Sequence, residues 1–213
     1  MNGVFITGSN TEVGKTTVSV DIIKHLIKKR KVVVRKPVET NCELVNSSFF
    51  PKDAIMLKEA CSSSESLEIV CPFCFELEAS PEAASANSGG LLRLSDLVKA
   101  CRSGAGDSFV VVEGAGGFYS PIANKSLNSD LAAQLNLPII IVVRDELGAV
   151  SQALLTINAA KSYQLKTACV ILNEIEPNQL FNAEALRGYT EVLIIEYSKS
   201  KISSFCSKIE KLI

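Results

Sequence analysis

The chain has 213 residues, of which 47% are hydrophobic and 21% charged, so it can bury a substantial core and is too apolar to be disordered. Its formal net charge of −1 gives no overall attraction to nucleic acid or to an anionic membrane, and we expect neither as a partner. No apolar stretch approaches the roughly 18 residues that span a bilayer. The seven cysteines follow no disulfide-like spacing and the first residues do not resemble a secretory signal, so we expect a cytoplasmic protein.

Short apolar runs alternate along the chain with longer segments of helical periodicity. The predicted strands are Val4–Thr7, Val32–Arg35, Phe109–Val112, Ile139–Val143, Ala168–Leu172 and Val192–Ile195. The predicted helices lie at about 15–30, 52–61, 94–102, 128–136, 147–163, 180–188 and 201–212. Strands that are apolar throughout are typical of parallel sheets covered on both faces. We therefore predict a single α/β domain over residues 1–213, with a doubly wound, mainly parallel sheet of the P-loop NTPase type and helices on both faces.

Residues 41–93 form the least regular part of the chain. They include a serine run at 62–64, three prolines and the sequence NSGG at 87–90, which together predict loops with one or two helices. Cys71 and Cys74 form a C-x-x-C pair, but there is no second pair, and the only histidine, His25, lies in a predicted helix. We interpret the cysteines as packing residues, because free cysteine is usually buried.

The first predicted strand runs directly into the sequence GSNTEVGKT, residues 8–16. Five residues separate Gly8 from Gly14, whereas a phosphate-binding loop usually has four, but the strand–loop–helix context is the required one. The backbone N–H groups of residues 12–17 would point at the β-phosphate, helped by the start of the helix. Lys15 would bridge the β- and γ-phosphates, and the Thr16 hydroxyl would bind Mg²⁺. The segment predicts a nucleotide site.

Charged residues follow the next two strands of the predicted sheet. Glu113 directly follows the strand Phe109–Val112, where a second metal ligand is expected. Three glycines within residues 114–117 follow it and would let the backbone approach a phosphate. Lys36 ends the second strand and is followed by proline, which keeps the backbone extended. Taken alone, Lys36 would more often be a solvated charge. Asp53 either caps the next helix or reaches Mg²⁺.

Asn173 and Glu174 follow the strand Ala168–Leu172, where residues that contact the base sit in many such sheets. A guanine-reading N-K-x-D motif needs lysine after the asparagine, and glutamate in that position argues against a GTPase.

The motifs, taken together and in order, resemble the dethiobiotin synthetase family. The resemblance covers about residues 3–176 and consists of GSNTEVGKT, KPVET, Asp53-Ala54, SPEAASA, VEGAGG with Pro121, Leu147-Gly148 and Asn173-Glu174. In this family the loop reads G-x-x-T-x-V-G-K-T, which accounts for the extra residue. KPVET and VEGAGG, combined with this loop, are quite specific.

The resemblance implies an ATP- and Mg²⁺-dependent ligase that closes the ureido ring of dethiobiotin from 7,8-diaminononanoate and CO₂. The intermediates would be a carbamate and a carbamic–phosphoric anhydride. The catalytic residues would be Lys36 and Lys15, and Mg²⁺ would be bound by Thr16, Asp53 and Glu113. The ATP site would comprise Glu12, Val13, Gly14, Lys15, Thr16, Thr17, Asp53, Glu113, Gly114, Ala115, Gly116, Asn173 and Glu174.

The family is homodimeric, which implies a homodimer here. Thr11, Thr40 and Gly117 would line the substrate side, and the substrate's carboxylate tail would lie near the helix start Gly148–Ser151 of the partner. The chain departs from the family at Ser151, where a larger amide side chain is expected. It also lacks a G-E-I-P-like segment after Val192, where the sequence continues LIIEY.

Two other functions share this fold type. A regulatory ATPase of the chromosome-partitioning or cell-division type has a signature lysine five positions before the loop lysine, and here that position is Asn10. A synthetase of the cobyrinic-acid type normally carries an additional glutaminase domain, for which this chain is short.

Overall fold

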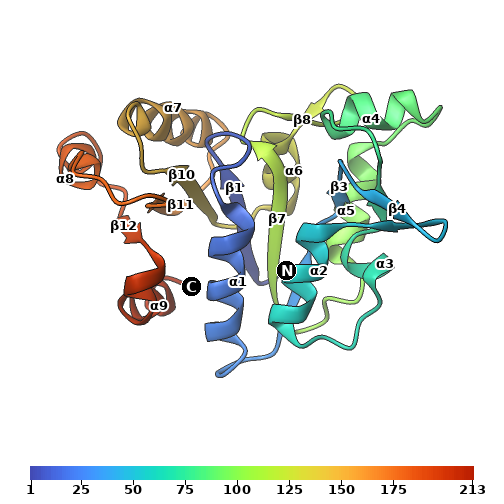
Figure 1. Ribbon diagram of the computed structural model, residues 1–213, viewed down its shortest axis with the longest axis horizontal. Helices are drawn as coiled ribbons and strands as arrows, with labels where there is room; N and C mark the ends of the chain where they lie inside the picture. The colour runs from blue at the N-terminus through green and yellow to red at the C-terminus, as the bar shows by residue number, and fades with distance from the viewer.

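A computed structural model describes residues 1–213 and is built on one six-stranded sheet (Figure 1). The strands lie in the order β12-β11-β10-β1-β7-β2, and every neighbouring pair is parallel. Their bounds are β1 (Gly3–Gly8), β2 (Val32–Arg35), β7 (Phe109–Gly117), β10 (Ile139–Arg144), β11 (Thr167–Asn173) and β12 (Ile194–Tyr197). The predicted α/β fold class is confirmed.

Helices cover both faces of this sheet (Figure 1). Successive strand side chains enter opposite cores: Phe5 packs on one side, and Val4 and Ile6 pack on the other. The core that contains Val4 is closed by α1 (Lys15–Leu26), α2 (Lys52–Cys61) and α9 (Ile202–Glu210). The core that contains Phe5 is closed by α5 (Leu94–Arg102), α6 (Asn128–Leu135), α7 (Ala149–Ser162) and α8 (Asn182–Arg187). This two-sided burial explains why the strands are apolar throughout.

Several predicted boundaries are wrong, and the widest difference is at β7, which was predicted to end at Val112 and continues to Gly117. Helix α1 ends at Leu26 instead of residue 30, because residues 28–31 are basic and mostly exposed and offer the core no apolar side chain. The last strand is Ile194–Tyr197, two residues later than predicted. The ring of Tyr197 is buried and its hydroxyl donates to Asp21 Oδ2 on α1 at 2.6 Å, which places this aromatic residue inside the strand.

Residues 41–93 contain more secondary structure than predicted. Around α2 they form the hairpin β4 (Glu43–Val45) and β5 (Ser48–Phe50), the helices α3 (Leu67–Val70) and α4 (Pro81–Asn87), and β6 (Phe73–Cys74), which pairs with β3 (Val38–Glu39). The remaining short elements are β8 (Pro121–Ala123), β9 (Ser126–Leu127) and the 3₁₀ turn η1 (Lys199–Lys201). Most of these elements have two to four residues, too few for a sequence period to predict them.

The parallel arrangement brings the carboxyl ends of all six strands to one edge of the sheet, where ligands bind in folds of this kind. The phosphate-loop sequence, Lys36 and Asn173 lie at or just beyond these strand ends, and Glu113 lies within β7 beside Ile6 of β1. No helix is both long enough and apolar enough to cross a membrane.

Candidate active site

The loop between β1 and α1 opens the helix on a glycine. Gly14 occupies the N-cap position with φ 86°, a left-handed conformation that glycine adopts at low cost. A Cβ at Gly14 would lie only 2.0 Å from Asn173 Nδ2, so a side chain does not fit. No side chain caps α1 and its first turn has no acidic residue. The start of α1 therefore presents free N–H groups and a positive dipole end, as an anion site requires.

Lys15 begins this helix and is largely buried. Its Nζ donates to the backbone oxygen of Asn10 at 3.1 Å. Burial, followed by the nearby positive charge of Lys36, lowers the pKa of Lys15 to about 8. A phosphate group beside Nζ would favour the charged form of this lysine.

Lys36 lies between two carboxylates at the centre of the site. Its Nζ is 2.8 Å from Glu113 Oε1 and 3.2 Å from Asp53 Oδ2, and it donates to the Gly114 oxygen at 3.3 Å. Burial alone would lower the pKa of Lys36, but the charges of Glu113 and Asp53 outweigh it and raise the pKa. Lys36 is therefore a fixed, protonated lysine and not a solvated strand-end charge.

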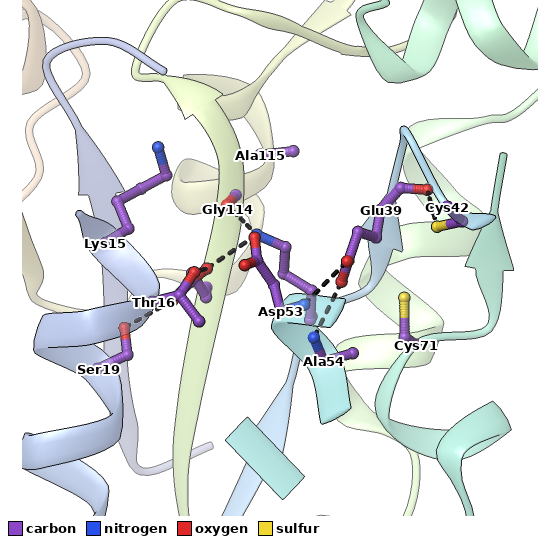
Figure 2. Close-up of polar contacts among 12 residues, drawn as sticks. Lys15, Thr16, Ser19, Glu39, Cys42, Asp53, Ala54, Cys71, Gly114 and Ala115 are labelled. Carbon is purple, nitrogen blue, oxygen red and sulfur yellow. Dashed lines mark hydrogen bonds and ion pairs between the residues drawn. The ribbon is translucent and has the colours of Figure 1, made fainter. Parts of the chain in front are cut away.

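Glu113 is fully buried and is held by two hydroxyls of α1. Thr16 Oγ1 donates to Oε1 at 2.8 Å and Ser19 Oγ donates to Oε2 at 2.7 Å. Figure 2 shows Thr16 and Ser19 on one side of β7 and Asp53 of α2 on the other. The predicted residues Thr16, Lys36, Asp53 and Glu113 are thus brought together in one network. Ser19 was not predicted, although its position one helical turn after Thr16 indicates the same face.

The oxygen atoms of this network fit Mg²⁺ bound together with a nucleotide. Thr16, Asp53 and Glu113 supply hydroxyl and carboxylate oxygens, the donors that Mg²⁺ prefers. No group of three histidine, cysteine, aspartate or glutamate side chains could hold a metal alone. This agrees with the usual Mg²⁺ arrangement, in which one or two carboxylates act with phosphate oxygens and water.

The structure separates the two interpretations of Asp53. The carboxylate of Asp53 contacts Lys36. The N–H groups at the start of α2 donate instead to the carboxylate of Glu39. Asp53 is therefore not the cap. Burial raises the pKa of Glu39 to about 7. Although Glu39 lies within KPVET, its capping role was not predicted, because the contact joins residues far apart in the sequence.

The glycine-rich segment after Glu113 continues β7 as far as Gly117. Gly116 has φ 74°, and the N–H of Gly117 donates to Ser120 Oγ at 2.8 Å. The buried amide of Asn128 accepts from the Ala115 N–H at 3.2 Å and donates to the Gly117 oxygen at 3.0 Å. Ser120 and Asn128 thus fix the shape of the segment, and neither belongs to a motif recognisable in the sequence.

Thr11 and Thr40 line one pocket of about 480 Å³, a size suited to a small molecule. Ala115 and Gly116 also line it, whereas Gly117 does not. Glu12 of the loop, predicted for the ATP site, lines it too. The remaining lining residues were not predicted as site residues: Asn41, Glu78, Ala79, Ser80, Pro81, Ser120 and Pro121. The pocket therefore lies between the phosphate loop, the segment after β3, the start of α4 and the end of β7.

Asn173 and Glu174 lie at the end of β11 but face different surroundings. Asn173 Nδ2 donates to the backbone oxygen of Val13 at 2.9 Å, so this buried amide is held against the phosphate loop. Glu174 lines a separate pocket of about 320 Å³ with Asp145, Asn178 and Tyr197 among its walls. A contact of either residue with adenine stays a prediction.

Ser151, in the first turn of α7, is exposed. The amide expected there is found one residue later, where Gln152 Oε1 accepts from Ser9 Oγ at 2.9 Å. This amide therefore contacts the phosphate loop of its own chain. A contact of Ser151 with a substrate tail stays a prediction.

All seven cysteines are free, and six of them are buried. The sulfurs of Cys71 and Cys74 are 3.7 Å apart, and Cys42 Sγ donates to the Glu39 oxygen at 3.5 Å. The contact with Cys74, followed by burial, raises the pKa of the Cys42 thiol. For Cys74, the contact with Cys42 lowers the pKa, but the contact with Cys71 and burial outweigh it and raise the pKa. Both thiols are therefore protonated at neutral pH.

Comparison with known proteins identifies the family. A family model described as an AAA domain matches residues 2–200. A protein of Vesicomyosocius okutanii subsp. Calyptogena okutanii (strain HA), named ATP-dependent dethiobiotin synthetase BioD, is 47% identical over 213 residues, which cover 100% of this chain and 97% of that protein. The chain belongs to the ATP-dependent dethiobiotin synthetase family.

Two further dethiobiotin synthetases agree with this assignment. The one from Ruthia magnifica subsp. Calyptogena magnifica is 46% identical, with 100% of this chain and 99% of that protein covered. The one from Anaeromyxobacter dehalogenans (strain 2CP-C) is 36% identical over 179 residues, covering 83% of this chain and 78% of that protein. The expected family resemblance is confirmed, and with it a ligase of biotin synthesis that depends on ATP.

Solved structures share the fold of this dethiobiotin synthetase family member at much lower identity. The MinC:MinD cell division protein complex of Aquifex aeolicus matches with a TM-score of 0.54 and 17% identity, covering 98% of this chain and 86% of the other. A ParA family ATPase of Chlorobium tepidum TLS matches with a TM-score of 0.56 and 10% identity, covering 98% and 90%. Such likeness shows the P-loop NTPase fold alone.

Proposed function

We propose that this chain closes the ureido ring of dethiobiotin from 7,8-diaminononanoate and CO₂, with ATP and Mg²⁺. One amine of the diamine carries CO₂ as a carbamate. A carbamate oxygen attacks the γ-phosphorus of ATP, which releases ADP and forms a carbamic–phosphoric anhydride. The second amine then attacks the carbonyl carbon, the C–O bond to phosphate breaks, and inorganic phosphate leaves with the ring closed.

The observation that carries the proposal is the fixed Lys36 at the end of β2, facing the start of α1. A carbamate and a triphosphate would bring several negative charges together in this site, and preorganised positive charge stabilises such a transition state. Because neighbouring carboxylates raise the pKa of Lys36, its ammonium group is present at neutral pH. Lys36 is thus assigned to the carbamate and the transferring phosphoryl group.

Lys15 and the backbone of residues 12–17 are assigned to the phosphates of ATP, at the uncapped end of α1. Mg²⁺ would be held by Thr16, Asp53 and Glu113, and when bound it would neutralise charge on the β- and γ-phosphates. The backbone of Gly114, Ala115 and Gly116 completes this side of the site, and Asn173 and Glu174 are assigned to the adenine side.

The pocket lined by Thr11 and Thr40 is assigned to the diamine, because it adjoins both the phosphate loop and the end of β7. Gly117, the last residue of β7, is assigned to the same substrate side. We propose a cytoplasmic homodimer in which the substrate's carboxylate tail reaches the partner subunit's Ser151, at the start of α7, where free backbone N–H groups favour a carboxylate.

The test is a ring-closure assay with purified protein, ATP, Mg²⁺, 7,8-diaminononanoate and bicarbonate. We expect dethiobiotin by mass spectrometry and phosphate release that depends on the diamine. Parallel reactions with other nucleoside triphosphates measure the selectivity for adenine. ATP hydrolysis that ignores the diamine and yields no ring would contradict the proposal and favour a regulatory ATPase.

A further inference from the structure

Helix α2 lacks a local cap at the end that carries Asp53. The first N–H groups of a helix have no partner within the helix, and an N-cap Ser, Asp or Asn usually accepts from the second and third residues. In α2 the N-cap is Pro51, which makes no side-chain cap, and the second and third residues are Asp53 and Ala54.

Glu39 supplies this cap from a different element. One carboxylate oxygen accepts from the N–H of Asp53 and the other from the N–H of Ala54, both at 2.9 Å (Figure 2). Glu39 lies on β3, 14 residues before Asp53, and is 8% exposed. Its own backbone is fixed, since the Glu39 oxygen accepts from the Phe75 N–H at 3.0 Å where β3 pairs with β6. A rigid strand therefore holds the start of α2.

The carboxylate of Asp53 is otherwise held by the side chains of Lys36 and Thr16. Its side chain is 42% exposed, and its closest polar partner is Lys36 at 3.2 Å. Because the side chain is this exposed, the direction of the carboxylate also depends on the backbone of Asp53, which Glu39 fixes. A negative charge at a helix start is also favoured by the helix dipole.

We infer that Glu39 is a positioning residue: by capping α2 from β3, it holds the Asp53 carboxylate beside Lys36 and in reach of a metal–nucleotide complex. The inference rests on the proposed function only in taking Asp53 as a ligand of the metal. It predicts that loss of Glu39 changes catalysis through the first turn of α2 and leaves the phosphate loop intact.

The test compares Glu39→Ala and Glu39→Gln with a double variant that restores a local cap, Glu39→Ala with Pro51→Ser. The serine hydroxyl introduced by Pro51→Ser would stand at the N-cap and accept from the same N–H groups. Glu43→Gln is the matched control, because Glu43 is an exposed carboxylate that pairs with the side chain of Lys52, the first residue of α2, and touches no backbone N–H there.

Three quantities are measured for each variant. They are kcat and KM for ATP in the ring-closure assay, the Mg²⁺ concentration at half-maximal rate, and the amide hydrogen exchange of Asp53 and Ala54 in the metal-free protein. Glu39→Ala should lower kcat about tenfold, in line with the loss of a helix cap, and should speed exchange at both amides. The kcat of Glu39→Gln should lie between those of the wild type and Glu39→Ala, since the glutamine amide oxygen can accept from one N–H group. The double variant should regain most of the wild-type kcat.

The half-maximal Mg²⁺ concentration should rise in Glu39→Ala while KM for ATP at saturating Mg²⁺ changes less than about twofold. Unchanged kcat and Mg²⁺ dependence, with only a lower melting temperature, would overturn the inference. So would unchanged exchange at Asp53 and Ala54. If Glu39→Ala does not fold, Glu39→Gln decides by the same criteria. If the wild-type protein closes no ring, the proposed function is wrong but the inference about Glu39 is not contradicted. Amide hydrogen exchange and Mg²⁺-dependent nucleotide binding, measured on the same variants, then decide the role of Glu39.

Discussion

Two helices begin at the site, and one has an uncapped N-terminus whereas the other is capped. Helix α1 starts at Gly14 with no side-chain cap and no acid in its first turn. Helix α2 starts with Asp53 in its first turn and the Glu39 carboxylate on its N–H groups. The first end is free to bind an anion, whereas the second is already neutralised and presents a carboxylate to cations. Under the proposed function, this difference would divide the site into a phosphate side at α1 and a metal side at α2, with Lys36 between them.

Removing Lys36 should have the largest effect, because it takes away the cation that both sides share. We expect Lys36→Ala to lower kcat for ring closure by about 10²–10³-fold, the size found for the loss of one preorganised electrostatic group. Nucleotide affinity, measured by calorimetry, should change little, because Lys15 and α1 remain. Lys52→Ala, at an exposed lysine on α2, is the control. A near-normal kcat in Lys36→Ala would contradict the assignment of Lys36 to the reacting groups and would show that the residues around the start of α1 are sufficient.

Closing the open end of α1 should have the next largest effect. Gly14→Ala would place a methyl group 2.0 Å from Asn173 Nδ2 and impose left-handed strain of about 1–2 kcal/mol. We expect ATP affinity and melting temperature both to fall. Gly89→Ala is the matched control, since Gly89 has φ 74° with nothing within 4 Å of the added methyl. If both variants lose the same stability, the contact with Asn173 contributes nothing to the loop.

The closed end of α2 should show a smaller effect, as a pH dependence of stability. Burial raises the pKa of Glu39 from 4.5 to about 7, so the unfolded chain releases this proton at lower pH than the folded chain. The contribution of Glu39 to the free energy of unfolding therefore falls as the pH rises from 4.5 to 7 and is constant on either side. Urea denaturation of the wild type and Glu39→Gln across this window should show the difference moving in favour of glutamine. A difference independent of pH would mean that the carboxylate is well solvated.

The contrast between the two helix ends also separates what the sequence can predict from what it cannot. The phosphate side is local: strand, loop, Gly14 and Lys15 follow one another, so residue order was enough to predict their placement. The metal side is not local, because Glu39 and Asp53 meet only when β3 pairs with β6 and α2 packs on β2. The sequence left the cap and metal interpretations of Asp53 open for that reason.

The same distinction explains the errors elsewhere. The six strands of the main sheet were predictable because they are apolar throughout, whereas the short elements of residues 41–93 depend on contacts with each other. That Gln152 contacts Ser9 of the phosphate loop could not be predicted, because the contact depends on how α7 packs beside the loop. The start of β12 was misplaced for a similar reason, since the buried contact between Tyr197 and Asp21 is invisible in the order of residues.

The contact of Asn173 with Val13 has a consequence for how the two ends of a bound nucleotide communicate. Asn173 ends β11 next to Glu174, which lines a separate pocket, and the amide of Asn173 donates to Val13 in the loop that would surround the phosphates. If Asn173 contacts adenine, as proposed above, a change at the nucleobase would reach the loop around the phosphates through this one side chain. In that case, replacing ATP with another nucleoside triphosphate would change the turnover number through the alignment of the γ-phosphoryl group, even at equal nucleotide affinity.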